Sequence, residues 1–151
     1  MKKVYLGADH AGFKLKEHLK KYLLNQGYQV KDLGNHQFKK TDDYPDFAAK
    51  VGRAVAKDSF ARGILVCHNG VGICIAANKV KGVRAALVDK VRVAREAVND
   101  ANANVICFGQ ADIKPLEAAR ASEVFLKTKF SPAARHQRRF KKLTKIESAN
   151  K

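Results

Sequence analysis

Residues 67–72, with the sequence Cys-His-Asn-Gly-Val-Gly, place a thiol and two glycines between a short apolar run and the apolar stretch 73–78. Glycines let backbone N–H groups approach a ligand, and the positive potential at a helix start favours anions. The same potential favours the thiolate form of Cys67, which is the reactive form of a cysteine. The segment is a candidate anion or oxyanion pocket with a sulfur at its mouth, although an ordinary glycine-rich turn has the same pattern.

A second polar segment, Gly-Ala-Asp-His-Ala-Gly at 7–12, follows the first apolar run of the chain. Asp9 and His10 would stand at the end of a strand, directly before a helix beginning near Phe13. There they could orient a polar substrate. The simpler alternative is an aspartate that caps the helix, with a histidine on the surface.

A third candidate lies in a basic C-terminal helix that we expect from about residue 132. Arg135 and Arg139 are four residues apart and share one face of this helix, where two guanidinium groups can grip a phosphate. Phe140, Leu143 and Ile146 give the helix another face for packing, either on its own chain or on a partner subunit. A solvated basic tail is the alternative.

Several other chemistries lack their motifs. The five histidines do not have metal-ligand spacing and no acidic cluster lies beside them, so we expect no metal. The chain has no Gly-x-Ser-x-Gly elbow, and segment 67–72 lacks the downstream residues of dinucleotide and nucleoside-triphosphate loops. Three irregularly spaced cysteines do not suggest a disulfide framework, and Cys74 and Cys107 lie in apolar runs typical of the core.

Short apolar runs alternate with amphipathic segments along the chain. We expect strands at 4–6, 28–33, 63–66, 84–88 and 105–108, and helices over 13–23, 47–55, 73–78, 91–101 and 115–127. This alternation predicts an α/β fold with a parallel sheet covered on both faces, in the open doubly wound arrangement. In such sheets ligands bind at the carboxyl ends of the strands, where Asp9, His10 and Cys67 fall. No repeat or long linker interrupts the pattern, so we expect one domain over 1–151.

The formal net charge is +16, from 30 basic and 14 acidic residues. Such a field attracts nucleic acid, phosphorylated metabolites and anionic membranes. Residues 127–151 hold a large share of it, and we expect the other basic residues on solvated helix faces. No stretch approaches the roughly 18–20 apolar residues of a membrane span, and the first residues have no signal core. We therefore expect a cytoplasmic protein without membrane association.

In this order, the three polar segments resemble the ribose-5-phosphate isomerase B family, which includes galactose-6-phosphate isomerase subunits and allose-6-phosphate isomerases. The resemblance covers roughly residues 3–146. It rests on the segments 7–12, Asp43-Tyr44-Pro45, Cys67 with Gly70-Val71-Gly72, 76–79, 82–85, Asn104-Val105 with Phe108-Gly109, and Arg135-His136 with Arg139.

This resemblance implies a three-layer α/β/α sandwich with a five-stranded parallel, Rossmann-like sheet and a C-terminal helix. It implies a homodimer or homotetramer with active sites between subunits, and an aldose–ketose isomerase that needs no cofactor. The Cys67 thiolate would move a proton between C1 and C2 of the opened sugar, through a cis-enediolate held by backbone N–H groups. The implied substrate contacts are Asp9, His10, Tyr44, His68, Asn69, Gly70, Val71, Gly72 and, from the neighbouring chain, Arg135 and Arg139.

Four positions depart from the family pattern. His68 replaces a glycine, because family members usually have Cys-Gly-Ser/Thr-Gly where this chain has Cys-His-Asn-Gly at 67–70. Asn69 replaces a hydroxyl that shuttles a proton between substrate oxygens; its amide can hydrogen-bond an enediolate but relays protons poorly. Asp100 replaces the ring-opening histidine, and a carboxylate there could take over this acid–base work. Ala111 replaces a basic residue, for which Lys114 could substitute.

These observations leave three functions open. The first is interconversion of ribose 5-phosphate and ribulose 5-phosphate, a step of the pentose phosphate pathway. The changes at His68, Asn69 and Asp100 leave open a six-carbon substrate of the allose or galactose 6-phosphate type. The high charge leaves open a non-catalytic protein that binds sugar phosphate or nucleic acid, although no nucleic-acid recognition motif is present and we expect no such partner.

Overall fold

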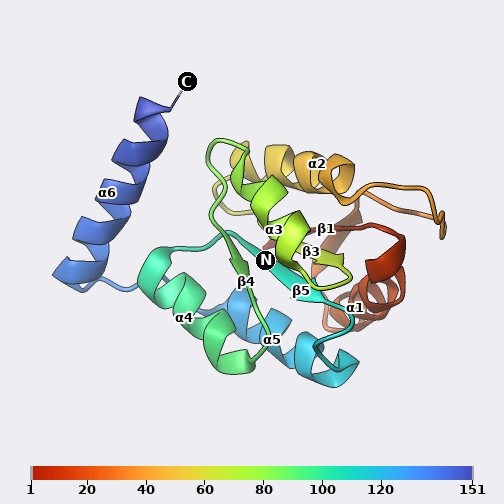
Figure 1. The fold of residues 1–151 in the computed structure, drawn as a ribbon. Coiled ribbons are helices and arrows are strands. Elements are labelled where there is room, and N and C mark those ends of the chain that lie inside the picture. Colours follow the sequence, from red (N-terminus) through yellow and green to blue (C-terminus); the bar gives the residue numbers. More distant parts are fainter. Residues whose placement is uncertain (1, 151) are drawn as a thin grey trace.

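The computed structural model describes residues 2–150, which are built around one five-stranded sheet (Figure 1). The strands lie side by side in the order β2-β1-β3-β5-β4, and every pair is parallel. Their bounds are β1 Lys3–Ala8, β2 Gln29–Asp32, β3 Arg62–Cys67, β4 Ala85–Leu87 and β5 Val105–Gly109. The expected α/β fold with a five-stranded parallel sheet is confirmed.

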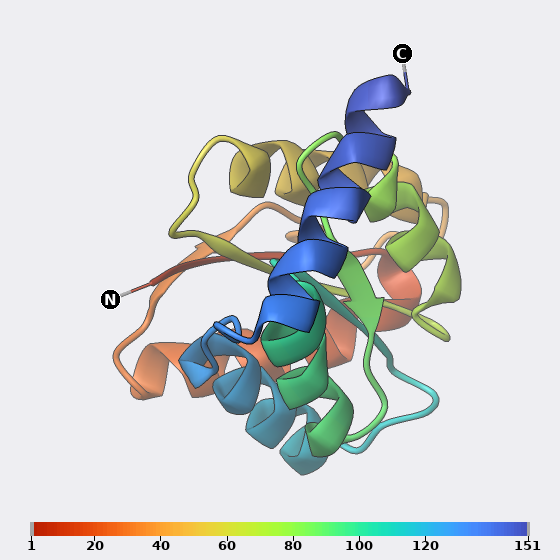
Figure 2. The same ribbon diagram turned by 90° about the vertical axis from the view of Figure 1, so that its left-hand side faces the viewer.

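Helices cover both faces of the sheet (Figures 1 and 2). One face carries α1 (Phe13–Asn25), α4 (Val91–Ala101) and α5 (Pro115–Lys127), and the other carries α2 (Tyr44–Ala56) and α3 (Val71–Asn78). Leu6 and Phe108 are buried on the first face, and Leu65 and Val105 on the second. Because the central strands are buried on both sides, they have the nearly continuous apolar runs seen in the sequence.

The last helix, α6 (Ala134–Ala149), stands outside these two layers (Figure 2). It is tied to the amino ends of β4 and β5, because Glu147 Oε1 accepts the backbone N–H of Gly82 at 2.7 Å. The guanidinium of Arg84 lies 5.1 Å from the centre of the Phe140 ring. The helix therefore lies by the amino edge of the sheet. Among residues 2–150, no helix is long and apolar enough to cross a membrane.

Strand β4 has one free edge, and a side chain covers part of it. The amide of Asn78 accepts the backbone N–H of Ala85 at 2.8 Å and donates to the carbonyl of Ala85 at 2.9 Å. One side chain thus makes the pair of hydrogen bonds that a neighbouring strand would make.

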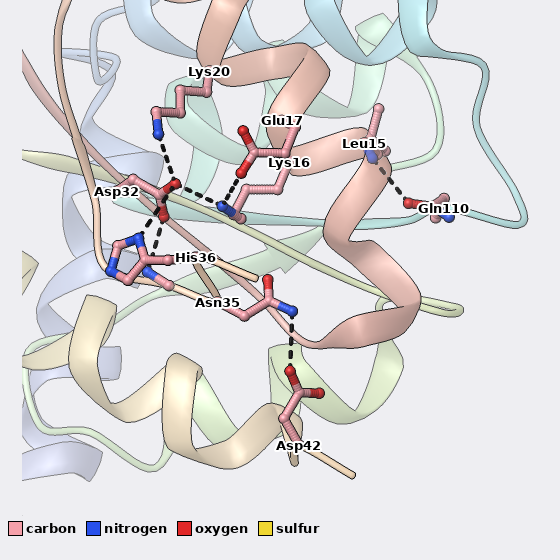
Figure 3. Close-up of polar contacts among 10 residues, drawn as sticks. Leu15, Lys16, Glu17, Lys20, Asp32, Asn35, His36, Asp42 and Gln110 are labelled. Atoms are coloured by element: carbon pink, nitrogen blue, oxygen red, sulfur yellow. Dashed lines mark hydrogen bonds and ion pairs between the residues drawn. The ribbon is translucent and has the colours of Figure 1, made fainter. Parts of the chain in front are cut away.

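Lys16 contradicts the expectation that the dispersed basic residues lie on solvated helix faces. Its side chain is fully buried on α1, and Nζ lies 2.6 Å from Asp32 Oδ2 (Figure 3). Burial acts to raise the pKa of Asp32, but hydrogen bonds from Lys16, from the N–H of Gly34 and from Lys20 outweigh it and lower the pKa. This buried ion pair fixes the start of the loop that follows β2.

Candidate active site

The glycine loop between β3 and α3 surrounds the thiol with backbone donors. The N–H of Gly70 donates to Cys67 Sγ at 3.2 Å, and the N–H of Val71 donates to Asn69 Oδ1 at 3.0 Å. Gly70 has φ 77°, and a Cβ there would lie 2.5 Å from Leu87 Cδ1. Only glycine fits both the left-handed backbone and this close approach, so Gly70 fixes the path of the loop into α3, which begins two residues earlier than expected.

Cys67 is less accessible than the sequence suggested. The residue is only 4% exposed, whereas we expected its thiol at the mouth of the pocket. Side chains alternate along a strand, so Cys67 shares the face of Leu65 and joins the apolar layer beneath α2 and α3. A substrate would reach the sulfur from the loop side, where His68 and Asn69 are exposed. All three cysteines are free; Cys107 is buried as expected, while Cys74 is only half-buried.

Asp9 and His10 follow β1 beside this loop, because Ala8 is in register with Val66 of β3. Asp9 is buried, its Oδ1 accepts the N–H of Gly12 at 3.1 Å, and burial raises its pKa. His10 Nδ1 lies 2.8 Å from Asp42 Oδ1, and the backbone N–H of His10 donates to the same oxygen at 2.8 Å. The hydrogen bond with Asp42 is the main cause that raises the pKa of His10.

Tyr44 begins α2 and lies against the first turn of α3. A Cβ on Gly72 would lie 2.5 Å from Tyr44 Cζ, so the absence of a side chain at Gly72 lets the ring approach. The carboxyl edge of the sheet thus brings together Asp9, His10, Tyr44 and the loop residues Cys67, His68, Asn69, Gly70, Val71 and Gly72.

The other three predicted site residues form a separate group. Asp100 lies near the end of α4, on the way to the amino end of β5, and its Oδ1 is 3.6 Å from His136 Nε2 on α6. Arg135 and Arg139 are on the same helix, are exposed, and form no ion pair within residues 2–150. Cys67 is in register with Gly109 at the carboxyl end of β5, and Val105 begins the same strand four residues earlier. The carboxyl and amino edges of the sheet are therefore about 13 Å apart.

Asp42 and Asn35 were not predicted as site residues, although both hold His10 in place. Asn35 Nδ2 donates to Asp42 Oδ2 at 3.0 Å (Figure 3). Asp42 is 32 positions from His10 in the chain, and no local pattern joins them. The only signal was its place directly before the Asp43-Tyr44-Pro45 marker.

An open cleft of about 670 Å³ adjoins the glycine loop, and its lining includes Asn69, Val71, Asp89 and Asp112. This volume suits a small molecule, but the two aspartates disfavour a phosphate group. Cations for a phosphate would therefore have to come from elsewhere. In the described range 2–150, no three His, Cys, Asp or Glu side chains are grouped so as to hold a metal ion.

Comparison with known proteins assigns the chain to a family. The sequence model of the family described as ribose/galactose isomerase matches residues 4–143. The chain belongs to the ribose/galactose isomerase family. Within this family, the probable ribose-5-phosphate isomerase B of Mycoplasma genitalium is 42% identical over 145 residues, which are 95% of this chain and 95% of the relative.

Solved structures of ribose/galactose isomerase family members share the whole fold. The ribose-5-phosphate isomerase B of Mycoplasma genitalium, solved with bound ribulose 5-phosphate, matches with a TM-score of 0.92 and 41% identity. The match covers 97% of this chain and 96% of the Mycoplasma chain. The ribose-5-phosphate isomerase B of Clostridium thermocellum has a TM-score of 0.93 and 37% identity, and covers 99% of each chain. The family expected from the motifs is confirmed.

Proposed function

We propose that this chain is a ribose-5-phosphate isomerase that interconverts ribose 5-phosphate and ribulose 5-phosphate without a cofactor. The observation that carries the proposal is a cysteine sulfur at the end of β3 that accepts a backbone N–H from its own glycine loop, in a family whose relatives along the full chain are named for this reaction.

The Cys67 thiolate would take the proton from C2 of the open aldose and return it to C1, while a proton moves from O2 to O1. The enediolate between these steps carries negative charge on oxygen, which backbone N–H groups of the loop stabilise. Asn69 Oδ1 already accepts the N–H of Val71, so its Nδ2 is left to donate to an enediolate oxygen.

We also propose that two chains build each active site, in a homodimer or a homotetramer. The thiol loop and the arginine pair lie at opposite edges of one sheet, so an arginine must reach the loop from a second chain. Large apolar side chains are exposed on the helices and the edge strand between these groups, as expected for an interface; they are Val71, Ile75, Leu87, Leu143 and Ile146.

The proton transfer is tested by replacing the sulfur. Cys67→Ala should lower kcat for ribose 5-phosphate by at least about a thousandfold, because the only base for the carbon-bound proton is lost. Cys74→Ala removes a neighbouring thiol outside the site and should keep most of the activity. Assays with a chelator present exclude a metal requirement. Full activity in Cys67→Ala would refute the proposal.

Shared sites are tested by complementation. Cys67→Ala and Arg139→Ala chains should each be inactive alone. Unfolding and refolding them together should restore about a quarter of the wild-type activity, because a mixed dimer has one site with both residues intact. A mixture that stays inactive, although light scattering shows that dimers form, would mean that each site belongs to one chain.

The six-carbon alternative rests on His68, Asn69 and Asp100, which depart from the family pattern on the ring-opening side of the predicted pocket. A panel of aldose phosphates decides between the sugars, and a clear preference for ribose 5-phosphate excludes this alternative. A single domain over 1–151 and a cytoplasmic location stay predictions from the sequence.

A further inference from the structure

Resting on the proposed isomerase function, we propose that His10, held by Asp42, opens the furanose ring of the aldose. Ribose 5-phosphate is mostly a ring closed between C1 and O4, and Cys67 can act only on the open form. Ribulose 5-phosphate has no such ring, because its O5 carries the phosphate. The aldose alone therefore needs an acid–base group beside the thiol loop.

His10 is the imidazole that the fold both places at this edge and orients. Its turn lies against the end of β3, because a Cβ on Gly12 would be 2.3 Å from the carbonyl oxygen of Val66. His68 lies on the loop itself, but its side chain is exposed and makes no hydrogen bond among residues 2–150. An acid–base catalyst must be oriented as well as near, and that favours His10.

Asp42 fixes which ring nitrogen faces a substrate. A carboxylate only accepts hydrogen bonds, so Nδ1 of His10 carries the proton in its 2.8 Å contact with Asp42 Oδ1. Nε2 is then the nitrogen left for the substrate, and the side chain keeps 32% of its surface. A carboxylate that holds Nδ1 and leaves Nε2 free is the arrangement enzymes use for proton transfer.

The carboxylate of Asp42 is itself anchored to the strand that carries His10. Its Oδ2 accepts Nδ2 of Asn35 at 3.0 Å (Figure 3). The backbone N–H of Asn35 donates to the Ala8 carbonyl at 3.0 Å, and the N–H of Ala8 donates to the Gly34 carbonyl at 2.9 Å. Strand, loop, carboxylate and imidazole therefore form one connected unit.

The charges around His10 suit an acid. Its charged neighbours are Asp9 and Asp42, both carboxylates, and they favour the imidazolium. Asp100, which replaces the histidine of the family pattern, lies instead at the amino edge of its own sheet, 3.6 Å from His136 Nε2.

The step balances as follows. The imidazolium Nε2–H gives its proton to O4, and the C1–O4 bond breaks with both electrons going to O4. The C1–OH becomes a protonated aldehyde, and the imidazole then takes the proton from O1. The products are the open aldehyde with a free C4 hydroxyl, and His10 is protonated as at the start.

Two reactions separate ring opening from the thiolate chemistry. Isomerisation of ribose 5-phosphate needs both, whereas exchange of the C1 proton of ribulose 5-phosphate in D2O, followed by NMR, needs only Cys67. We expect His10→Asn to lower kcat/KM for ribose 5-phosphate about a hundredfold. The rate of C1 proton exchange should fall by a factor at least about ten times smaller. Urea unfolding confirms that the variant is folded.

Asp42→Asn tests the positioning role through a pH profile. The acid must be protonated, so aldose isomerisation declines as pH rises through the pKa of His10. Removing the carboxylate charge lowers that pKa, and the alkaline limb of the profile should move to lower pH. Asp46→Asn removes a nearby exposed charge from the start of α2 and should leave the profile in place.

The outcomes are distinct. Equal loss of isomerisation and exchange in His10→Asn would make His10 a binding residue and overturn the proposal. A selective loss of aldose isomerisation in Asp100→Asn, with none in His10→Asn, would assign ring opening to Asp100. A wild-type protein that neither isomerises nor exchanges would refute the isomerase function itself.

Discussion

Replacement of Asp32 by asparagine would leave the buried ammonium of Lys16 without its closest counter-charge. The two groups are 2.6 Å apart, and the side chains are 0% and 5% exposed. With an effective dielectric constant of about 20, Coulomb's law gives an attraction of about 6 kcal/mol at this distance. Much of this offsets the loss of hydration. Without Asp32 the ammonium would keep only its 2.9 Å contact with Glu17 Oε1, and the Glu17 side chain is 39% exposed to water.

Breaking a buried pair from one side costs about 3–5 kcal/mol. We therefore expect Asp32→Asn to lower the free energy of unfolding by this amount, a large part of the about 5–15 kcal/mol of an ordinary domain. The melting temperature of a chain of this size should fall by about 6–20 °C. Urea unfolding, followed by circular dichroism, measures the change directly.

A matched exposed pair supplies the control. Arg92 and Glu96 on α4 are also 2.6 Å apart, but their side chains are 64% and 48% exposed. Water replaces a lost partner at such a site, so Glu96→Gln should leave the urea midpoint within experimental error. Equal effects of the two substitutions would refute the reasoning that burial, not distance, decides the strength of the pair. Adding Lys16→Met to Asp32→Asn should recover most of the loss.

The same pair predicts how stability depends on pH. The folded pKa of Asp32 is lowered, so its contribution is fully present above the ordinary aspartate value of about 3.9 and is lost as pH falls through the lowered pKa. The difference in stability between the wild type and Asp32→Asn should therefore shrink under acid conditions. A difference that stays constant down to that range would contradict the assignment.

Two glycine substitutions give further predictions. Gly70→Ala should lower the free energy of unfolding by at least about 1–2 kcal/mol and impair turnover, because φ is 77° and the added Cβ meets Leu87. Gly82→Ala is the control: its φ is 88°, but no atom lies closer than 3.4 Å to the added Cβ. This variant should lose stability through backbone strain and keep its turnover. Gly72→Ala should displace the Tyr44 ring, raise KM for ribose 5-phosphate and change the free energy of unfolding only slightly. Steady-state kinetics and urea unfolding measure the two effects. An unchanged KM would mean that the ring has no role in binding.

The strands and the starts of α1, α4 and α5 were predictable because they follow local rules, whereas α2 begins three residues earlier than predicted. Apolar runs marked all five strands, although β2 and β4 are each one residue shorter at both ends than expected. Pro115 begins α5, as a proline in a first turn should. Gly70 was placed correctly in the glycine-rich turn, but its left-handed backbone lets α3 begin at Val71, two residues before the predicted start at Ile73.

What the sequence could not give were contacts between distant segments. Lys16 looks like any lysine of a basic helix, and only the arrival of Asp32 at its side explains its burial. Asp42 reaches His10 across 32 positions through a loop with no regular structure. The residues at the carboxyl edge were grouped correctly because the end of each parallel strand falls there, whereas the distance of Asp100 and the arginines from them follows from the path of α4 and α6.

The amide of Asn78 has a consequence for how copies of this chain can meet. An uncovered strand at the border of a sheet is a template on which further strands can add without limit. Here a side chain from α3 occupies the donor and the acceptor of Ala85, so a sixth strand finds these positions taken. Copies that meet at this part of the border therefore contact one another through side chains rather than through added strand hydrogen bonds, which works against growth into a fibre.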